Sequence, residues 1–68
     1  MTLNGDAVRA LREAQKLSLR KLACLTGRHR SHLSRIERGL AGASSETEER
    51  IARALGVPEA AITHKETT

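Results

Sequence analysis

Hydrogen-bond donors are concentrated in one short stretch of the chain, RHRSHLSRIERG, at residues 28–39. Read at 3.6 residues per turn of helix, Leu33 and Ile36 fall on one face of this stretch. The other faces carry Arg30, Ser31, His32 and Arg35. Guanidinium, imidazole and hydroxyl groups donate hydrogen bonds to phosphate oxygens and to acceptor atoms on planar rings. The pattern therefore predicts a helix that is held by its Leu and Ile and presents its donors to a polar partner.

The sequence lacks the residue combinations that catalysis or metal binding requires. It contains no glycine-rich phosphate loop and no nucleophile beside a base and an orienting group. Cys24, His29 and His32 are the only soft metal ligands near one another, whereas a structural zinc site takes four ligands in paired spacing. We expect no enzyme activity, no metal, no cofactor and no small-molecule ligand.

Basic residues are gathered in the N-terminal part of the chain. Residues 1–38 contain nine Lys and Arg against three Asp and Glu, whereas residues 39–68 contain three against five. A basic half beside a mildly acidic half predicts a polyanionic partner for one face, most simply nucleic acid. A basic surface that is merely solvated is the alternative. Because the chain has no Phe, Tyr or Trp, single-stranded nucleic acid, which binds by stacking on aromatic rings, is disfavoured.

Nothing in the sequence predicts a membrane or secreted location. No apolar run approaches the roughly 18 residues that a membrane-spanning helix needs. The N-terminus lacks the basic-then-apolar pattern of a signal peptide. The single cysteine, Cys24, cannot form an internal disulfide. We expect a cytoplasmic protein with no membrane partner.

Glycines and polar capping residues divide the chain into short helices. With 68 residues and a core built from Leu, Ile, Val and Ala, the expected fold is all-α. The periodicity predicts five helices, within residues 6–16, 19–27, 29–39, 48–55 and 58–62. Ser18 is the predicted N-cap of the second helix, and Gly27 supplies a tight turn before the third, which is the sequence form of a helix-turn-helix. Ser45, three residues before Glu48, predicts a capping box for the fourth.

Four segments in this order resemble a known family. The segments VRALREAQKLS, LACLTG, SRIERG and IARALGVP, spaced as they are here, are similar to DNA-binding domains of the Cro and phage-repressor type, also called the xenobiotic-response-element-like helix-turn-helix family. The resemblance covers residues 6–62. It implies a compact, lambda-repressor-like bundle of five helices whose second and third form the helix-turn-helix. An N-terminal arm at residues 1–5 and a flexible C-terminal tail at residues 63–68 would flank this domain.

The resemblance also implies roles for individual residues. The family's base-contacting positions fall on Arg30, Ser31, His32 and Arg35. Its phosphate-contacting positions fall on Ser18, Leu19, Arg20, Arg28, His29 and Arg38. Arg12 and Glu37 match a partly buried structural ion pair. Arginine suits base contact because it can donate two hydrogen bonds to guanine, and the alternative is that Arg30 and Arg35 contact phosphates only.

The chain departs from the family at several positions. Leu19 stands where the family usually has Gln, and we expect it to pack or to touch a thymine methyl group, with packing favoured. Leu40 and Ala41 stand where the family often has Lys or Arg, which weakens the expected phosphate contact of that loop. An exposed Leu40 would either serve a protein contact or be an ordinary surface leucine.

The expected function is that of a sequence-specific regulator of transcription, most simply a repressor, that binds double-stranded DNA. Two copies would place their third helices in successive major grooves of a palindromic operator, about 34 Å apart. The homodimer, formed in solution or only on DNA, would use Pro58, Glu59, Ala61 and Ile62. The alternative is a protein-binding helix-turn-helix module, such as an antitoxin-like or regulator-binding partner, with little or no specific DNA binding.

Overall fold

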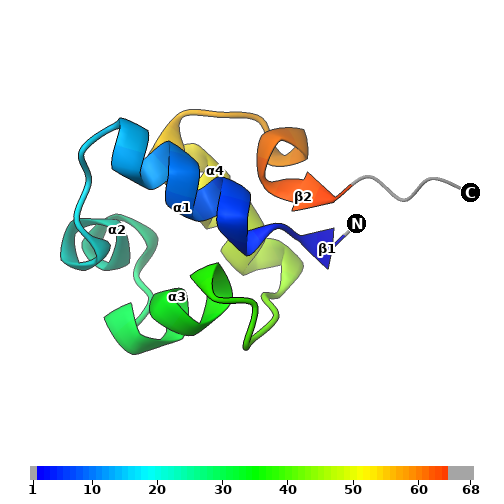
Figure 1. The fold of residues 1–68 in the computed structure, drawn as a ribbon, viewed down its shortest axis with the longest axis horizontal. Helices are drawn as coiled ribbons and strands as arrows, with labels where there is room; N and C mark the ends of the chain where they lie inside the picture. The colour runs from blue at the N-terminus through cyan, green and yellow to red at the C-terminus, as the bar shows by residue number, and fades with distance from the viewer. Residues whose placement is uncertain (1, 65–68) are drawn as a thin grey trace, which may run out of the picture.

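The computed structural model describes residues 2–64. Within these residues, four α-helices and one short 3₁₀ helix make up most of the chain (Figure 1). The helices are α1 (Gly5–Ala14), α2 (Leu19–Thr26), α3 (Arg30–Glu37), α4 (Ser45–Leu55) and the 3₁₀ helix η1 (Glu59–Ile62). Two strands, β1 (Thr2–Leu3) and β2 (Thr63–His64), flank them. The predicted helical bundle with a helix-turn-helix formed by its second and third helices is confirmed.

The prediction of five α-helices is wrong, because the segment expected as the fifth is a single 3₁₀ turn. Its hydrogen bond joins residues three apart, from the N–H of Ala61 to the carbonyl of Pro58 at 2.9 Å. Thr63 already has the extended backbone of a strand, with φ −124° and ψ 150°. The four residues between Pro58 and Thr63 therefore have room for one tight turn and no more.

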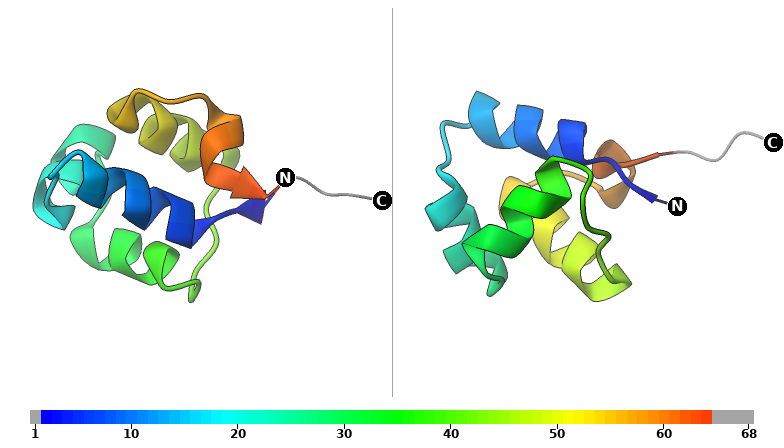
Figure 2. Two further views of the ribbon diagram at one scale, coloured as in Figure 1. Left: turned by 45° about the horizontal axis from the view of Figure 1, so that its top comes forward. Right: turned by 60° about the horizontal axis from the view of Figure 1, so that its bottom comes forward.

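A short antiparallel pairing joins the two ends of the described chain. Thr2 lies opposite His64, and Leu3 lies opposite Thr63. The N–H of Asn4 extends the contact by donating to the carbonyl of Ile62 at 2.7 Å. Figures 1 and 2 show β1 and β2 side by side at one end of the molecule. Strands of two residues are too short to show an alternating pattern, so the sequence did not predict them. Residues 65–68 of the predicted tail lie outside the described residues.

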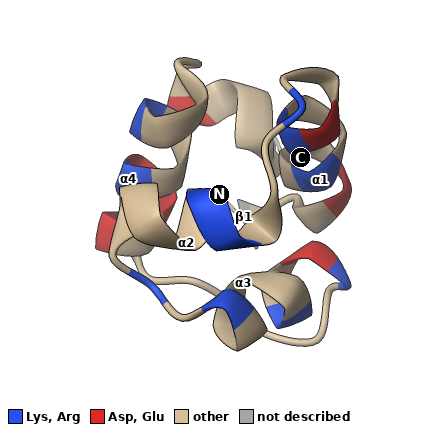
Figure 3. Ribbon diagram, turned by 90° about the vertical axis from the view of Figure 1, so that its left-hand side faces the viewer, with Lys and Arg blue, Asp and Glu red and all other residues tan. Residues whose placement is uncertain are grey.

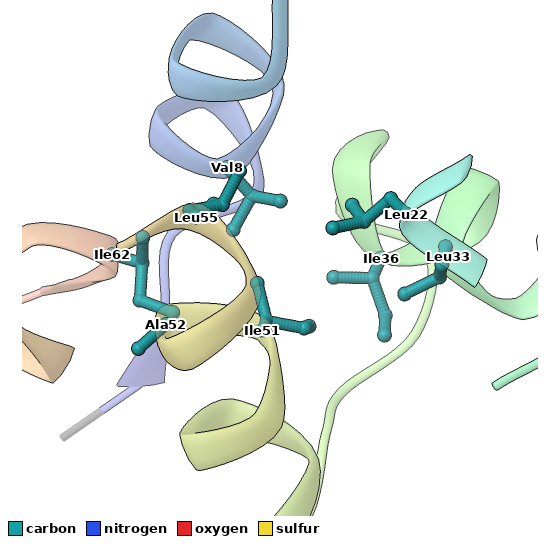
Figure 4. Close-up of a cluster of buried hydrophobic side chains, with 8 residues drawn as sticks. All are labelled: Val8, Leu22, Leu33, Ile36, Ile51, Ala52, Leu55 and Ile62. Carbon is teal, nitrogen blue, oxygen red and sulfur yellow. The ribbon is translucent and has the colours of Figure 1, made fainter. Parts of the chain in front are cut away.

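The core lies where the four α-helices and η1 meet (Figure 4). Its buried side chains are Val8, Leu22, Leu33, Ile36, Ile51, Ala52, Leu55 and Ile62. Burying a Leu or Ile side chain fully stabilises a protein by about 1.5–3 kcal/mol relative to leaving it exposed. Leu33 and Ile36, the predicted apolar face of α3, both belong to this cluster. The rest of the protein therefore holds α3 through that face.

The turn between α2 and α3 follows from two residues that the sequence identified. The Ser18 hydroxyl accepts a hydrogen bond from the N–H of Lys21 at 3.0 Å and caps α2. Gly27, at the C-cap of α2, has φ 69°, a left-handed conformation that glycine adopts without the steric cost of a Cβ atom. The chain can then reverse within residues 27–29, and α3 begins at Arg30.

Ser44 caps α4, and the prediction that Ser45 does so is wrong. The Ser44 hydroxyl accepts from the N–H of Thr47 at 3.2 Å. Ser45 is already the first residue of the helix, so it cannot form the predicted capping box with Glu48. With Ser44 as the cap, Thr47 is only 4% exposed and shares an inward stripe with Ile51, one turn further on. The local capping-box pattern favours Ser45, and the packing of Thr47 accounts for the use of Ser44 instead.

Gly5, the first residue of α1, lies directly against the C-terminal end of α3. A Cβ atom on Gly5 would overlap the carbonyl oxygen of Ile36 and lie 2.9 Å from that of Glu37. The two helices can approach this closely only because the residue has no side chain. α1 begins one residue earlier than predicted, capped by Asn4, whose Oδ1 accepts from the N–H of Ala7 at 3.2 Å.

Candidate nucleic-acid interface

The basic surface of the protein is formed by α2, the turn after it and α3 (Figure 3). Residues 14–36 contain six Lys and Arg and no Asp or Glu. In Figure 3, α2 and most of α3 carry basic positions and no acidic ones, whereas α1 and α4 carry both signs and the C-terminal end of α3 carries an acidic position. Separating the two signs in this way concentrates positive potential on one face of the protein.

α3 turns a polar face to solvent because its apolar face is used in the core. Its buried residues are Leu33, Ile36 and Glu37. Its exposed residues are Arg30, Ser31 and Arg35, and the exposed Arg38 follows directly as the C-cap. His32 and Ser34 are half-buried between the two faces. Three of the four residues predicted to contact bases are thus on the solvent side of α3, and His32 is at its edge.

An open hollow lies between the first turns of α2 and α3. It is lined by Leu19, His29, Arg30, Ser31 and Ser34. The hollow brings two residues predicted to contact phosphate, Leu19 and His29, next to two predicted to contact bases, Arg30 and Ser31. Ser34 was not among the predicted site residues. Its position one helical turn after Arg30 was the available signal, and its hydroxyl adds both a donor and an acceptor to the hollow.

The first turn of α2 opens toward solvent beside this hollow. The side chain of Ser18 is exposed, and so is that of Arg20. At the start of any helix the first N–H groups, here those of Leu19 and Arg20, have no acceptor within the helix. The positive end of the helix dipole adds to their attraction for an anion. This end of α2 therefore has the chemistry to bind a phosphate group.

Arg28 differs from the other predicted phosphate contacts, because another part of the protein already holds it. Its Nε donates to the hydroxyl oxygen of Thr47 at 2.9 Å, which ties the turn after α2 to the start of α4. Arg28 is half-buried as a result. The sequence could not reveal this role, since Thr47 is 19 residues away. His29, at the N-cap of α3, makes no side-chain capping hydrogen bond and is exposed.

An ion pair between α1 and α3 supports the interface from behind. Nε and Nη2 of Arg12 donate to the two carboxylate oxygens of Glu37, at 2.8 and 3.1 Å. Nη1 of Arg12 donates to the carbonyl of Leu17 at 2.8 Å. The side chains of Arg12 and Glu37 are 12% and 5% exposed. Hydrogen bonding to Glu37 raises the pKa of Arg12 above its ordinary value, against the opposing effect of burial.

The segment predicted to form a dimer divides into exposed and buried residues. Pro58, Glu59 and Ala61 are exposed. Ile62 has no exposed surface and belongs to the core. The inclusion of Ile62 in a dimer interface is therefore corrected: its side chain completes the core of its own protomer and offers nothing to a second one.

Two further properties concern the whole described chain. Within residues 2–64, no helix combines the length and hydropathy that crossing a membrane requires. In the same part of the chain, no three His, Cys, Asp or Glu side chains are grouped so that they could hold a metal ion. Cys24 is a free thiol on the surface.

Known proteins of similar sequence share the fold of this chain. A family model described as a helix-turn-helix domain matches residues 5–64. The restriction-modification controller protein C.AhdI from Aeromonas hydrophila is 35% identical, with a TM-score of 0.82 over 84% of this chain and 86% of that chain. The clp gene regulator ClgR from C. glutamicum is 36% identical, with a TM-score of 0.78 over 82% of this chain and 73% of that chain.

A third similar protein was solved in complex with DNA. SinR, the master regulator for biofilm formation, in complex with DNA, is 31% identical, with a TM-score of 0.78 over 84% of this chain and 95% of that chain. Among curated protein sequences, none matches significantly. The three similar proteins are a controller protein and two regulators. This confirms the prediction that the chain is a helix-turn-helix regulator and not an enzyme. The chain belongs to the helix-turn-helix domain family.

Proposed function

We propose that this helix-turn-helix regulator binds a specific double-stranded DNA site by placing α3 in the major groove. The observation that carries the proposal is the orientation of α3. Leu33 and Ile36 hold the back of the helix in the core. Its front carries Arg30, Ser31 and Arg35, all exposed. The major groove is about 12 Å wide and admits one α-helix. The exposed face of α3 can therefore enter the groove while Leu33 and Ile36 stay packed in the core.

Arg30 and Arg35 supply the base readout. A guanidinium can donate two hydrogen bonds to O6 and N7 of guanine, which is the commonest specific contact in the major groove. The short hydroxyl groups of Ser31 and Ser34 can donate or accept, so they tolerate several bases. His32 lies at the edge of the exposed face of α3, so we expect it to contact a base at the edge of the half-site. We expect at least one G·C pair in each half-site, contacted by Arg30.

The flanks of α3 supply contacts to the DNA backbone. The free amides after Ser18 suit one phosphate, and the exposed side chains of Arg20, His29 and Arg38 suit its neighbours. Arg28 contributes less than its charge suggests, because Thr47 holds its Nε. Each neutralised phosphate releases condensed counterions, so the affinity falls steeply as the salt concentration rises.

We propose that two copies bind together on a palindromic operator. α3 has eight residues, about 12 Å of helix, and reaches the edges of only a few base pairs. Two copies related by a twofold axis read two half-sites about 34 Å apart, which lengthens the recognised sequence. Pro58, Glu59 and Ala61 are the exposed residues that we assign to the dimer contact. Occupation of a promoter by such a dimer blocks transcription, so repression is the simplest outcome.

The test is selection of bound duplexes from a random-sequence pool at physiological salt, followed by sequencing. A two-fold symmetric motif that contains guanine in each half is the expected result. Arg30→Ala, selected in parallel, should lose the preference at one position per half-site. Arg53→Ala is the matched control, because Arg53 is exposed on α4 and its only ion pair among the described residues is with Glu49, which is also exposed.

Retention without an enriched sequence, or no retention, would contradict the proposal. It would favour the protein-binding module instead. One observation gives that alternative some weight: Leu25 and Leu40 are large apolar side chains that are 49% and 60% exposed. They lie on different segments, α2 and the loop after α3, and single exposed leucines are common on protein surfaces.

A further inference from the structure

Leu19 is the one aliphatic side chain in the hollow between α2 and α3. The other lining residues, all polar, are His29, Arg30, Ser31 and Ser34. Leu19 also lines a second hollow with Ser34, Arg38 and residues of α1. It is therefore an apolar group in the middle of a basic and hydroxyl-rich face, and the proposed function turns this face to DNA.

Packing within the protein accounts for only part of the Leu19 side chain. The residue is half-buried, and it packs against the core cluster. The remainder faces the hollow. When a duplex covers this face, that apolar surface leaves water whichever base lies opposite. Placing it against a hydrogen-bonding group leaves the polar group unsatisfied, whereas placing it against another apolar group is favourable.

The major-groove edge of unmodified DNA offers one apolar group, the C5 methyl of thymine. We propose that Leu19 contacts this methyl group, at a base pair adjacent to the one that Arg30 reads, and thereby determines one position of the operator. The two positions adjoin because Leu19 and Arg30 line the same hollow. This inference rests on the proposed function, since it requires α3 to lie in the major groove.

The test removes one methyl group from the DNA and leaves the protein intact. Each thymine of the selected operator is replaced in turn by uracil, which lacks only the C5 methyl and keeps every hydrogen-bonding group. At one thymine per half-site, the affinity of the unchanged protein should fall about fourfold, the equivalent of about 0.8 kcal/mol for one buried carbon. Binding by Leu19→Ala should be insensitive to the same replacement.

Leu25→Ala is the matched control for Leu19→Ala. Leu25 lies on the same helix and is 49% exposed, but it lines a different hollow with Arg50, Arg53 and Ala54. Leu25→Ala should keep the fourfold effect of uracil. Leu19→Gln is a second variant, which retains the length of the side chain and should also lose the effect. Comparing thymine with uracil within each variant cancels any change in the folded fraction.

The outcomes separate the inference from the function on which it rests. A preferred operator in which every thymine accepts uracil without loss would overturn the role of Leu19 and leave the proposed function intact. A uracil effect that persists in Leu19→Ala and Leu19→Gln would do the same. Failure to select any preferred duplex would contradict the proposed function, and the inference with it.

Discussion

Arg12 on α1 and Glu37 on α3 form a largely buried ion pair, in which each charge compensates the other. Both carboxylate oxygens of Glu37 accept hydrogen bonds from Arg12, and both side chains are largely withdrawn from water. A lone buried charge costs several kcal/mol, so each residue requires the other. The pair joins the end of α3 to α1. It also turns the only carboxylate of α3 away from the face proposed to meet phosphate.

Glu37→Ala should lower the free energy of unfolding by about 3–5 kcal/mol, because it leaves the largely buried guanidinium of Arg12 with its hydrogen bond to Leu17 but without a counter-charge. Urea unfolding measures the change. Glu49→Ala is the control, since it breaks an exposed pair with Arg53 and should cost less than about 1 kcal/mol. Because the pKa of Arg12 is raised in the folded protein, its contribution to stability is fully present at any pH below the ordinary pKa of arginine and is lost only above that pKa. The difference in unfolding free energy between wild type and Glu37→Ala should therefore be constant around neutral pH. Unchanged unfolding with altered DNA binding would refute the structural role.

Arg30→Ala should weaken binding to the selected operator by about 1–3 kcal/mol and leave binding to random duplex almost unchanged. Arg20→Ala should weaken both kinds of binding alike and reduce the slope of log affinity against log salt by about 1. Arg20 is a better backbone control than Arg28, because loss of the Arg28 contact to Thr47 would also loosen α4. Titrations at several salt concentrations measure both effects, and equal losses for Arg30→Ala on both duplexes would assign it to phosphate.

Gly5→Ala should destabilise the protein by about 1–3 kcal/mol, because the new methyl group pushes α1 off the carbonyl oxygens of Ile36 and Glu37. Gly42→Ala is the matched control, since a Cβ atom there meets nothing within 4 Å. Thermal unfolding of both variants tests the contact. Equal melting temperatures would show that the two helices do not approach as closely as described.

Lys16→Gly should stabilise the protein by up to about 1 kcal/mol. Lys16 has φ 58°, a left-handed conformation that costs a residue with a Cβ atom roughly 1–2 kcal/mol, part of which glycine loses again in chain entropy. Lys21→Gly, within α2, should instead cost about 1 kcal/mol. Chemical unfolding distinguishes the two, and a loss of stability for Lys16→Gly would mean that its side chain makes a compensating contact.

The local features of the fold could be predicted from the sequence. Ser18 and Gly27 mark the ends of α2 through their own chemistry, and the spacing of Leu33 and Ile36 places α3 against the core. These properties depend on residues a few positions apart, so a single sequence contains them. The same spacing could have identified Ser34 as part of the hollow.

The remaining features depend on contacts between distant segments. Arg28 meets Thr47 and Gly5 meets Ile36 only after the helices have packed. Ile62 looks like a surface residue of a short terminal helix in the sequence, but the 3₁₀ turn directs it into the core. Local chemistry favours Ser45 as the cap of α4 through Glu48, but the helix as packed is capped by Ser44. These features are stabilised by contacts between segments that are distant in the sequence, so no short stretch of sequence predicts them.

The pairing of β1 with β2 sets an order in which the molecule assembles. It pairs residues 2–3 with residues 63–64 and so closes a loop that contains nearly all of the described chain. Closing a loop costs entropy that increases with its length, whereas α2, its turn and α3 close only short ones. The helices should therefore dock first and the paired ends last. Opening of the ends, visible as fast hydrogen exchange at the amide of Asn4, would leave α3 in place.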